Sequence, residues 1–158
     1  MTNKWDIRFL ELAQLVSTWS KDPSTKTGAV IVRPNRTVVS VGFNGFPREM
    51  SDVPEWYADR EEKYLRIIHC EVNALIYSPE RVDGYTLYTY PFACCDRCVV
   101  QMLQAGITRF VFPEPTKDAL LRWGKAFDKT KKYMKECAVA FLEVPLGEVE
   151  CKLKPMSN

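Results

Sequence analysis

The sequence predicts an α/β fold: a three-layer α/β/α domain with a central mixed sheet of about five strands. Short runs of β-branched and aromatic residues alternate with longer stretches whose apolar residues recur at helical spacing. A pair of strands joined by a tight turn precedes this alternation. The length of 158 residues suits one compact domain. We therefore predict a single domain over residues 1–158.

The first predicted element is an amphipathic helix over residues 4–20. Its apolar residues recur every three or four positions: Trp5, Phe9, Leu12, Ala13, Val16 and Trp19. Polar, turn-forming residues at 20–26 follow. Charges are scattered among the first apolar residues, and no small-residue cleavage site follows them. We therefore expect no secretory signal and a cytoplasmic protein.

A β-hairpin comes next. Residues 27–33 form a β-branched strand, residues 34–36 supply the turn and residues 37–42 form the return strand. The segment Phe-Asn-Gly-Phe-Pro at 43–47 then breaks the pattern. Its glycine and proline predict a loop in which Asn44 is held in place, although a simple turn with core aromatics also fits this composition.

The middle of the chain predicts two helical segments and a strand. Residues 51–63 are polar and acidic, and they form a loop that enters a helix near Glu55. Residues 67–77 predict a helix entered near His69, because a proline follows soon after its end. After a glycine-containing turn, residues 85–90 alternate as a strand.

The last part of the chain continues the alternation. Residues 95–105 predict a helix ended by Gly106, at the position that favours a C-terminal cap. A short strand at 109–112, a charged amphipathic helix at 116–135 and a final strand at 138–144 follow. Beyond these residues the sequence carries little signal.

Four residues of the central region have the spacing of a catalytic zinc site. His69 is the only histidine in the chain, and Glu71 stands two positions after it. Cys95 and Cys98 form a Cys-x-x-Cys pair, whose thiolates reach one metal ion from the first turn of a helix. In this signature of zinc deaminases the histidine and two cysteines hold the metal and the glutamate moves protons. The pattern predicts an enzyme that binds Zn²⁺.

Neighbouring cysteines leave the ligand set open at two points. Cys94 could take the place of Cys95 as a ligand if the loop before the helix is bulged, although the Cys-x-x-Cys spacing favours Cys95. Cys94 or Cys70 could also close the metal shell and make the site structural, which would leave the nearby glutamate without a purpose. Only Cys137 and Cys151 stand apart from this region, so we expect reduced thiols rather than disulfides.

The composition limits the classes of partner that we expect for this chain. Hydrophobic residues make up 46% of the chain and charged residues 27%, and no apolar run approaches the roughly 20 residues that span a bilayer. A net charge of +2 with mixed signs gives no strong field for wrapping a polyanion. We therefore expect no membrane span and no nucleic-acid interface.

Over residues 5–112 the chain resembles the deoxycytidylate deaminase family of the cytidine deaminase-like superfamily. The segment Val-Gly-Phe-Asn-Gly-Phe-Pro at 41–47 is similar to the family's G-Y-N-G-x-P, and His-Cys-Glu-Val-Asn-Ala at 69–74 matches H-A-E-x-N-A with Cys in place of Ala. Further similar segments are Ser-Lys-Asp-Pro at 20–23, the strand 28–32 and Gln-Ala-Gly-Ile at 104–107. The resemblance implies a cytidine deaminase-like fold.

The resemblance also assigns roles to single residues. It implies that His69, Cys95 and Cys98 bind Zn²⁺ and that Glu71 shuttles protons. It also implies that Asn44 holds the substrate and that the backbone at Cys70 contacts the pyrimidine carbonyl. It places the substrate phosphate only loosely, on Lys21 or Lys26. In the family a proline precedes the first cysteine, whereas this chain has Cys94 there.

The implied activity is hydrolytic deamination of dCMP to dUMP, which feeds thymidylate synthesis. Many members of the family are oligomers, often hexamers, activated by dCTP and inhibited by dTTP. The resemblance therefore implies a homo-oligomer, a dimer or a hexamer, and regulation by these nucleotides. Alternative readings are a deaminase that edits tRNA or another nucleic acid, a deaminase of a modified cytosine nucleotide, and a zinc-binding or nucleotide-sensing module without activity. Acidic residues interrupt the lysines near the C-terminus, which argues against nucleic acid.

Overall fold

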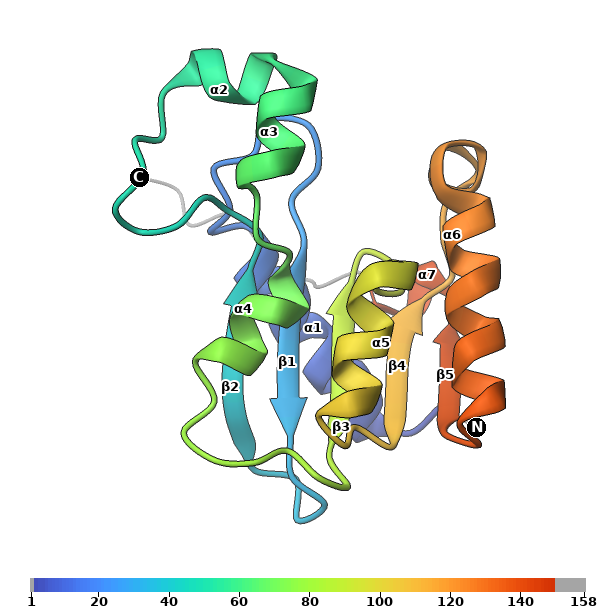
Figure 1. Ribbon diagram of the computed structural model, residues 1–158. Coiled ribbons are helices and arrows are strands. Elements are labelled where there is room, and N and C mark those ends of the chain that lie inside the picture. Colours follow the sequence, from blue (N-terminus) through green and yellow to red (C-terminus); the bar gives the residue numbers. More distant parts are fainter. Residues whose placement is uncertain (1, 150–158) are drawn as a thin grey trace, which may run out of the picture.

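A computed structural model describes residues 2–149 and has one five-stranded mixed sheet within them (Figure 1). The strands are β1 (Gly28–Val32), β2 (Val38–Phe43), β3 (Thr86–Tyr90), β4 (Arg109–Pro113) and β5 (Ala140–Val144). Their order in the sheet is β2-β1-β3-β4-β5. β1 is antiparallel to both of its neighbours, whereas β3, β4 and β5 are parallel. The predicted mixed sheet is therefore confirmed.

Helices cover both faces of this sheet. The helices are α1 (Lys4–Ser17), α2 (Pro54–Ala58), α3 (Arg60–Arg66), α4 (Cys70–Ile76), α5 (Asp96–Gln104), α6 (Lys117–Glu136) and α7 (Leu146–Val149). α1 and α7 share one hydrophobic cluster with the sheet, and α4, α5 and α6 share the cluster on its opposite face. α2 and α3 stand beyond one end of the sheet (Figure 1). This is the predicted α/β/α arrangement.

The side chains of β1 show how the two faces are separated. All five residues of this central strand are buried. Ala29 and Ile31 belong to the cluster under α4, α5 and α6, whereas Val30 and Val32 belong to the cluster under α1. Successive side chains of a strand point to opposite faces, so one β-branched run supplies two cores.

Close packing against β2 fixes the position of α4, which begins directly after the predicted metal ligand His69. A Cβ atom added to Gly42 of β2 would clash with the backbone of Cys70 and Ala74. A glycine at this position therefore allows the first turn of α4 to lie directly against the sheet. Ser40 of β2 also donates a hydrogen bond to the carbonyl oxygen of Ala74 at 2.6 Å, which fixes the helix along the strand.

Two predicted helices differ from the observed ones. The first helix ends at Ser17 rather than at residue 20, and Trp19 is half exposed against Phe43 instead of lying in the core. The segment 51–63, predicted as a loop entering one helix, holds α2 and most of α3. Asp59 separates them, because its extended backbone ends α2 and its side chain accepts hydrogen bonds from the first turn of α3.

The helix predicted over residues 67–77 begins only at Cys70, because Ile67 has extended backbone that ends α3 and His69 is the N-cap of α4. The other predicted elements are found within one or two residues of their expected ends, and Gly106 has the positive φ expected after α5. No helix in the part of the chain that the structure describes is long and apolar enough to cross a membrane. The cysteines within this part are free thiols, and Cys151 lies outside it.

A buried ion pair ties α1 to the sheet. The Asp6 carboxylate accepts hydrogen bonds from both terminal nitrogens of Arg109 at 2.8 and 2.9 Å and from the Tyr88 hydroxyl at 2.9 Å. Burial by itself raises the pKa of Asp6, but the hydrogen bonds from Arg109 and Tyr88 and the charge of Arg109 outweigh burial and lower it. The ionised carboxylate therefore stabilises the folded state.

Replacing Asp6 by Asn is expected to lower the free energy of unfolding by about 2 kcal/mol at pH 7, because Arg109 loses a charged partner. A lowered folded-state pKa gives stability that is present above the unfolded pKa and is lost as the pH falls through the folded pKa. The difference between wild type and Asp6→Asn should therefore shrink with acidification below about pH 4. Urea unfolding at several pH values measures it.

Asp83→Asn is the matched control, because the exposed pair of Asp83 with Arg81 should contribute little to stability. Equal stability of Asp6→Asn and wild type at pH 7 would contradict the stabilising role of the buried pair.

Candidate metal centre and active site

Two helix N-termini deliver the predicted metal ligands. His69 is the residue that precedes α4 in the capping position, and Cys95 takes the same position before α5. Cys98 lies in the first turn of α5, and its backbone N–H donates a hydrogen bond to the Cys95 sulfur at 3.4 Å. Helix N-termini favour negative charge, so the start of α5 is a suitable place for thiolates.

The three ligand atoms have the spacing of one zinc site. His69 Nδ1 lies 3.6 Å from Cys95 Sγ and 3.4 Å from Cys98 Sγ, and all three atoms lie within 4.8 Å of one another. Tetrahedral zinc with usual bond lengths holds such nitrogen and sulfur atoms about 3.5–3.8 Å apart. The donor set therefore fits Zn²⁺, and three protein ligands leave the fourth position open, as a catalytic site requires.

The neighbouring Cys94 does not join this group. Its side chain is buried, and its carbonyl oxygen accepts a hydrogen bond from the Thr130 hydroxyl of α6 at 3.0 Å. Within residues 2–149, the cluster of potential ligands contains Cys95 and leaves out both Cys94 and Cys70. This geometry favours the Cys-x-x-Cys reading of the ligands and an open shell rather than a closed structural one.

The electrostatics of the cluster favour bound cations. A hydrogen bond from Cys98, and then the interactions with His69, lower the pKa of Cys95 to about 4. The same bond to Cys95 raises the pKa of Cys98. The hydrogen bond to Cys95 also raises the pKa of His69. The lowered pKa of Cys95 favours its thiolate, which is the form that binds zinc.

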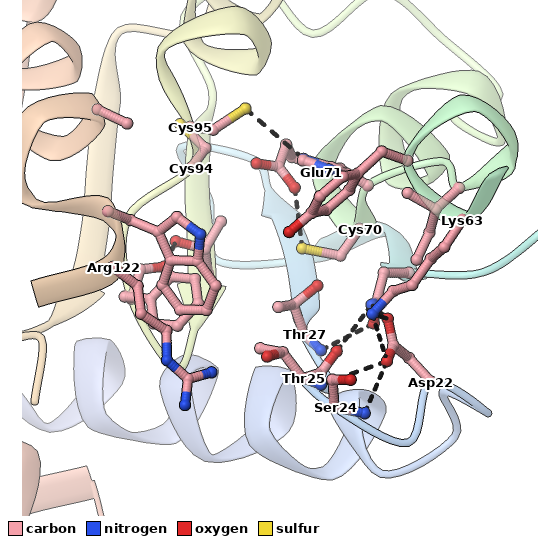
Figure 2. A pocket seen from close by; sticks show the side chains of 18 of the residues that line it. Asp22, Ser24, Thr25, Thr27, Lys63, Cys70, Glu71, Cys94, Cys95 and Arg122 are labelled. Carbon is pink, nitrogen blue, oxygen red and sulfur yellow. Dashed lines mark hydrogen bonds and ion pairs between the residues drawn. The ribbon is translucent and has the colours of Figure 1, made fainter. Parts of the chain in front are cut away.

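Glu71 lies beside this cluster. It is in the first turn of α4 and only 3% exposed, and together with His69 and Cys95 it lines a cavity of about 520 Å³. One carboxylate oxygen of Glu71 accepts a hydrogen bond from the Cys70 thiol at 2.9 Å (Figure 2). The structure therefore brings together the three predicted ligands and the predicted proton shuttle.

The predicted fixed loop forms one wall of the cavity. Asn44 Oδ1 accepts a hydrogen bond from the Thr27 backbone at 2.8 Å, and its Nδ2 donates to the Thr25 carbonyl oxygen at 2.9 Å. Asn44 is 5% exposed and lies in the wall beside both threonines. The expectation that this asparagine is held in place is confirmed, and its amide holds residues 25–27 against the cavity.

A buried ion pair in the same wall was not predicted from the sequence. Lys63 of α3 lies 2.8 Å from Asp22, which also accepts hydrogen bonds from the backbone of Ser24 and Thr25 (Figure 2). The Asp22 side chain is 2% exposed, so the pair joins α3 to the loop before β1 within the cavity wall. The sequence placed Asp22 in a polar turn, but nothing local identified its partner 41 residues away.

The predicted phosphate ligands lie elsewhere. Neither Lys21 nor Lys26 lines the cavity, and the Lys21 side chain is 68% exposed and pairs with Asp52. The basic residues of the wall are instead Arg60, Lys63 and Arg122.

An aromatic surface from α6 completes the cavity. Trp123 and Phe127 of this helix contact Phe92, with ring centroids 5.2 and 5.3 Å apart, and all three residues line the cavity. The sequence predicted α6 as an amphipathic helix but gave no sign that its apolar side reaches the metal loop.

Comparison with known proteins gives one family. The model of the cytidine and deoxycytidylate deaminase zinc-binding region matches residues 3–114. A protein of Aliivibrio fischeri, described as an uncharacterized deaminase in the luxG 3′ region, is 40% identical over 146 residues, which cover 92% of this chain and 97% of that protein. A probable deoxycytidylate deaminase of Caenorhabditis elegans is 33% identical over 145 residues, 89% of this chain and 70% of that protein.

The fold has a counterpart among solved structures. The dCMP deaminase of the cyanophage S-TIM5, in complex with dCMP and dUMP, superimposes with a TM-score of 0.71 at 21% sequence identity. The match covers 91% of this chain and 99% of the phage protein. This likeness confirms the predicted fold class. The family match ends at residue 114, so α6 with its part of the cavity wall lies beyond it.

Proposed function

Because this chain belongs to the cytidine and deoxycytidylate deaminase family, we propose that it is a zinc-dependent hydrolase that converts dCMP and water to dUMP and ammonia. The observation that carries the proposal is the convergence of His69, Cys95 and Cys98 on one metal-sized site, beside a cavity whose wall contains His69, Cys95 and Glu71. Relatives described as deoxycytidylate deaminases, at 33–34% identity, support dCMP as the substrate.

The residues of the site have two different roles, metal binding and proton transfer. His69, Cys95 and Cys98 hold the zinc ion, which when bound acts as a Lewis acid that lowers the pKa of water towards neutrality. Glu71 takes the proton of the attacking water and returns it to the ring nitrogen and then to the departing ammonia. The buried position of Glu71 beside the ligands places a proton acceptor where this transfer occurs.

The cavity wall supplies contacts for the pyrimidine. The backbone N–H of Cys70, at the first position of α4, has no acceptor within the helix and is available to the ring carbonyl. Phe92 and Trp123 offer an apolar face for the base, and Asn44 keeps the threonine loop against the sugar.

We place the substrate phosphate on the arginines of the wall. Within the wall, the charge of Lys63 is neutralised by Asp22. Within residues 2–149, the only carboxylate that forms an ion pair with Arg122 is that of the exposed Asp118. The Arg60 guanidinium packs on the Tyr64 ring and has no carboxylate partner in the same residues. Arginine guanidinium groups suit phosphate because they donate two parallel hydrogen bonds. This proposal replaces the looser assignment to Lys21 or Lys26.

We further propose a cytoplasmic homo-oligomer, a dimer or a hexamer. Four large apolar side chains near the ends of α1, β2 and α4 are exposed, namely Trp19, Phe43, Ile76 and Tyr77. The free thiols in the described part of the chain suit a reducing compartment. Regulation by dCTP and dTTP rests on the similarity of residues 41–47 to the corresponding family loop.

The test is ammonia release by purified protein of known zinc content, with dCMP, dCTP, deoxycytidine and a tRNA anticodon hairpin as substrates and with dCTP as an added effector. We expect dCMP to be turned over in preference to deoxycytidine, since only the nucleotide carries a phosphate. Exclusive turnover of the hairpin would support nucleic-acid editing instead. Silence on all four substrates by zinc-loaded protein would contradict the proposed activity and favour a modified cytosine nucleotide or a sensing role.

The same assay tests the phosphate site. Arg122→Gln is expected to raise the KM for dCMP about tenfold, because the phosphate loses one of its two charged partners while Arg60 remains. The rate with deoxycytidine, which has no phosphate, should not change. Lys125→Gln on the same helix is the control, since this exposed lysine does not line the cavity. A higher KM in Lys21→Gln with no change in Arg122→Gln would restore the assignment from the sequence.

A further inference from the structure

The Cys70 thiol is hydrogen-bonded to the proposed proton shuttle. Cys70 Sγ lies 2.9 Å from Glu71 Oε2, and both residues are 3% exposed. Figure 2 shows this contact in the middle of the cavity, with Thr27 below it, Lys63 and Asp22 on one side and Arg122 on the other. Within residues 2–149, no other group is hydrogen-bonded to the Glu71 carboxylate.

The direction of this bond follows from the chemistry of the two groups. The S–H group of Cys70 is the donor and Oε2 of Glu71 is the acceptor, because a carboxylate oxygen accepts hydrogen bonds. A glutamate side chain turns about three bonds, and an unheld carboxylate would lose rotational freedom each time it met the reacting water. The thiol removes part of this freedom in advance.

An alanine in place of Cys70 would offer no hydrogen-bond donor to the glutamate. The thiol also packs against the core beneath α4, α5 and α6. Packing alone would be served by any small apolar residue. The orientation of the thiol hydrogen bond towards Glu71 therefore points to a role beyond packing.

We propose that Cys70 is a positioning residue, whose S–H group fixes Oε2 of Glu71 and leaves Oε1 to take and return the proton. The inference rests on the proposed deaminase function. It concerns the side chain of Cys70, and is separate from the contact assigned to its backbone N–H.

Replacing Cys70 by Ala tests this role in the zinc-loaded protein with dCMP. We expect kcat to fall about five- to tenfold, the equivalent of one lost hydrogen bond, with KM within about twofold of wild type. Cys70→Ser is the matched variant, because its hydroxyl restores a donor in a side chain only one atom larger than that of alanine. It should keep kcat within about twofold of wild type. Zinc content and thermal unfolding are measured on each protein.

The outcomes distinguish a failure of the proposed deaminase function from a failure of the proposed role of Cys70. No turnover of dCMP by the wild-type protein overturns the proposed function and this inference with it. Normal wild-type turnover with equal kcat in Cys70→Ala overturns the inference alone, as does a serine variant as slow as the alanine variant. If Cys70→Ala does not fold, Cys70→Val fills the space without a donor, and normal kcat in that protein likewise overturns the inference.

Discussion

Replacing Glu71 by Gln is expected to reduce the turnover of dCMP by about 10²–10⁴-fold, while the protein keeps its zinc and its fold. Glutamine has the shape of glutamate but does not accept a proton from water at neutral pH, so the transfer to the ring nitrogen and to ammonia has no carrier. The three ligand atoms of the metal site belong to other residues, so metal binding should not depend on this side chain. Ammonia release, zinc analysis and circular dichroism on the same sample measure the three properties.

Wild-type protein purified in parallel is the reference for this experiment, and Glu71→Asp is a second variant that keeps a carboxylate. We expect Glu71→Asp to lie between wild type and Glu71→Gln, because the shorter side chain withdraws the acceptor but does not remove it. Unchanged turnover in Glu71→Gln would refute the assigned role of Glu71. Loss of zinc from the glutamine variant would indicate instead that Glu71 is needed for the metal site.

Replacing Cys95 by Ala is expected to remove zinc from the purified protein, whereas replacing Cys94 by Ala should leave about one zinc per chain. Of these two cysteines, only Cys95 places its sulfur next to His69 Nδ1 and within the ligand group. A site with two remaining ligands binds zinc far more weakly, because each ligand contributes a bond that water replaces poorly. Turnover should disappear together with the metal.

The two variants are well matched, because each replaces one cysteine by alanine, at consecutive positions of one loop. Metal analysis after dialysis against a weak chelator gives the zinc content, and thermal unfolding reports any cost of the space left by Cys94 in the core. Zinc retained in Cys95→Ala but lost in Cys94→Ala would reverse the ligand assignment and imply a bulged loop before α5.

The sequence was sufficient to predict the candidate metal ligands. His69 and the cysteine pair stand at the starts of two helices, and a helix start can be read from local signals such as a nearby turn, the apolar spacing and the glycine that ends α5. The side chains at such starts converge on a ligand over one turn of helix, so the spacing of His-x-Glu and Cys-x-x-Cys sufficed. Asn44 was also predicted as a fixed residue, because the glycine and proline that follow it are typical of a turn with a defined backbone.

The surroundings of the candidate metal site could not be predicted from the sequence, because they depend on tertiary contacts. Lys63 meets Asp22 because α3 stands beyond the end of the sheet, and Trp123 meets Phe92 because α6 packs beside α5. Residues separated by 30 or more positions leave no local trace of such contacts, and Lys21 and Lys26 appeared equally suited to bind phosphate until their places outside the cavity were known. Local sequence sets backbone conformation and thereby the ligands, whereas the cavity wall depends on how distant elements pack together.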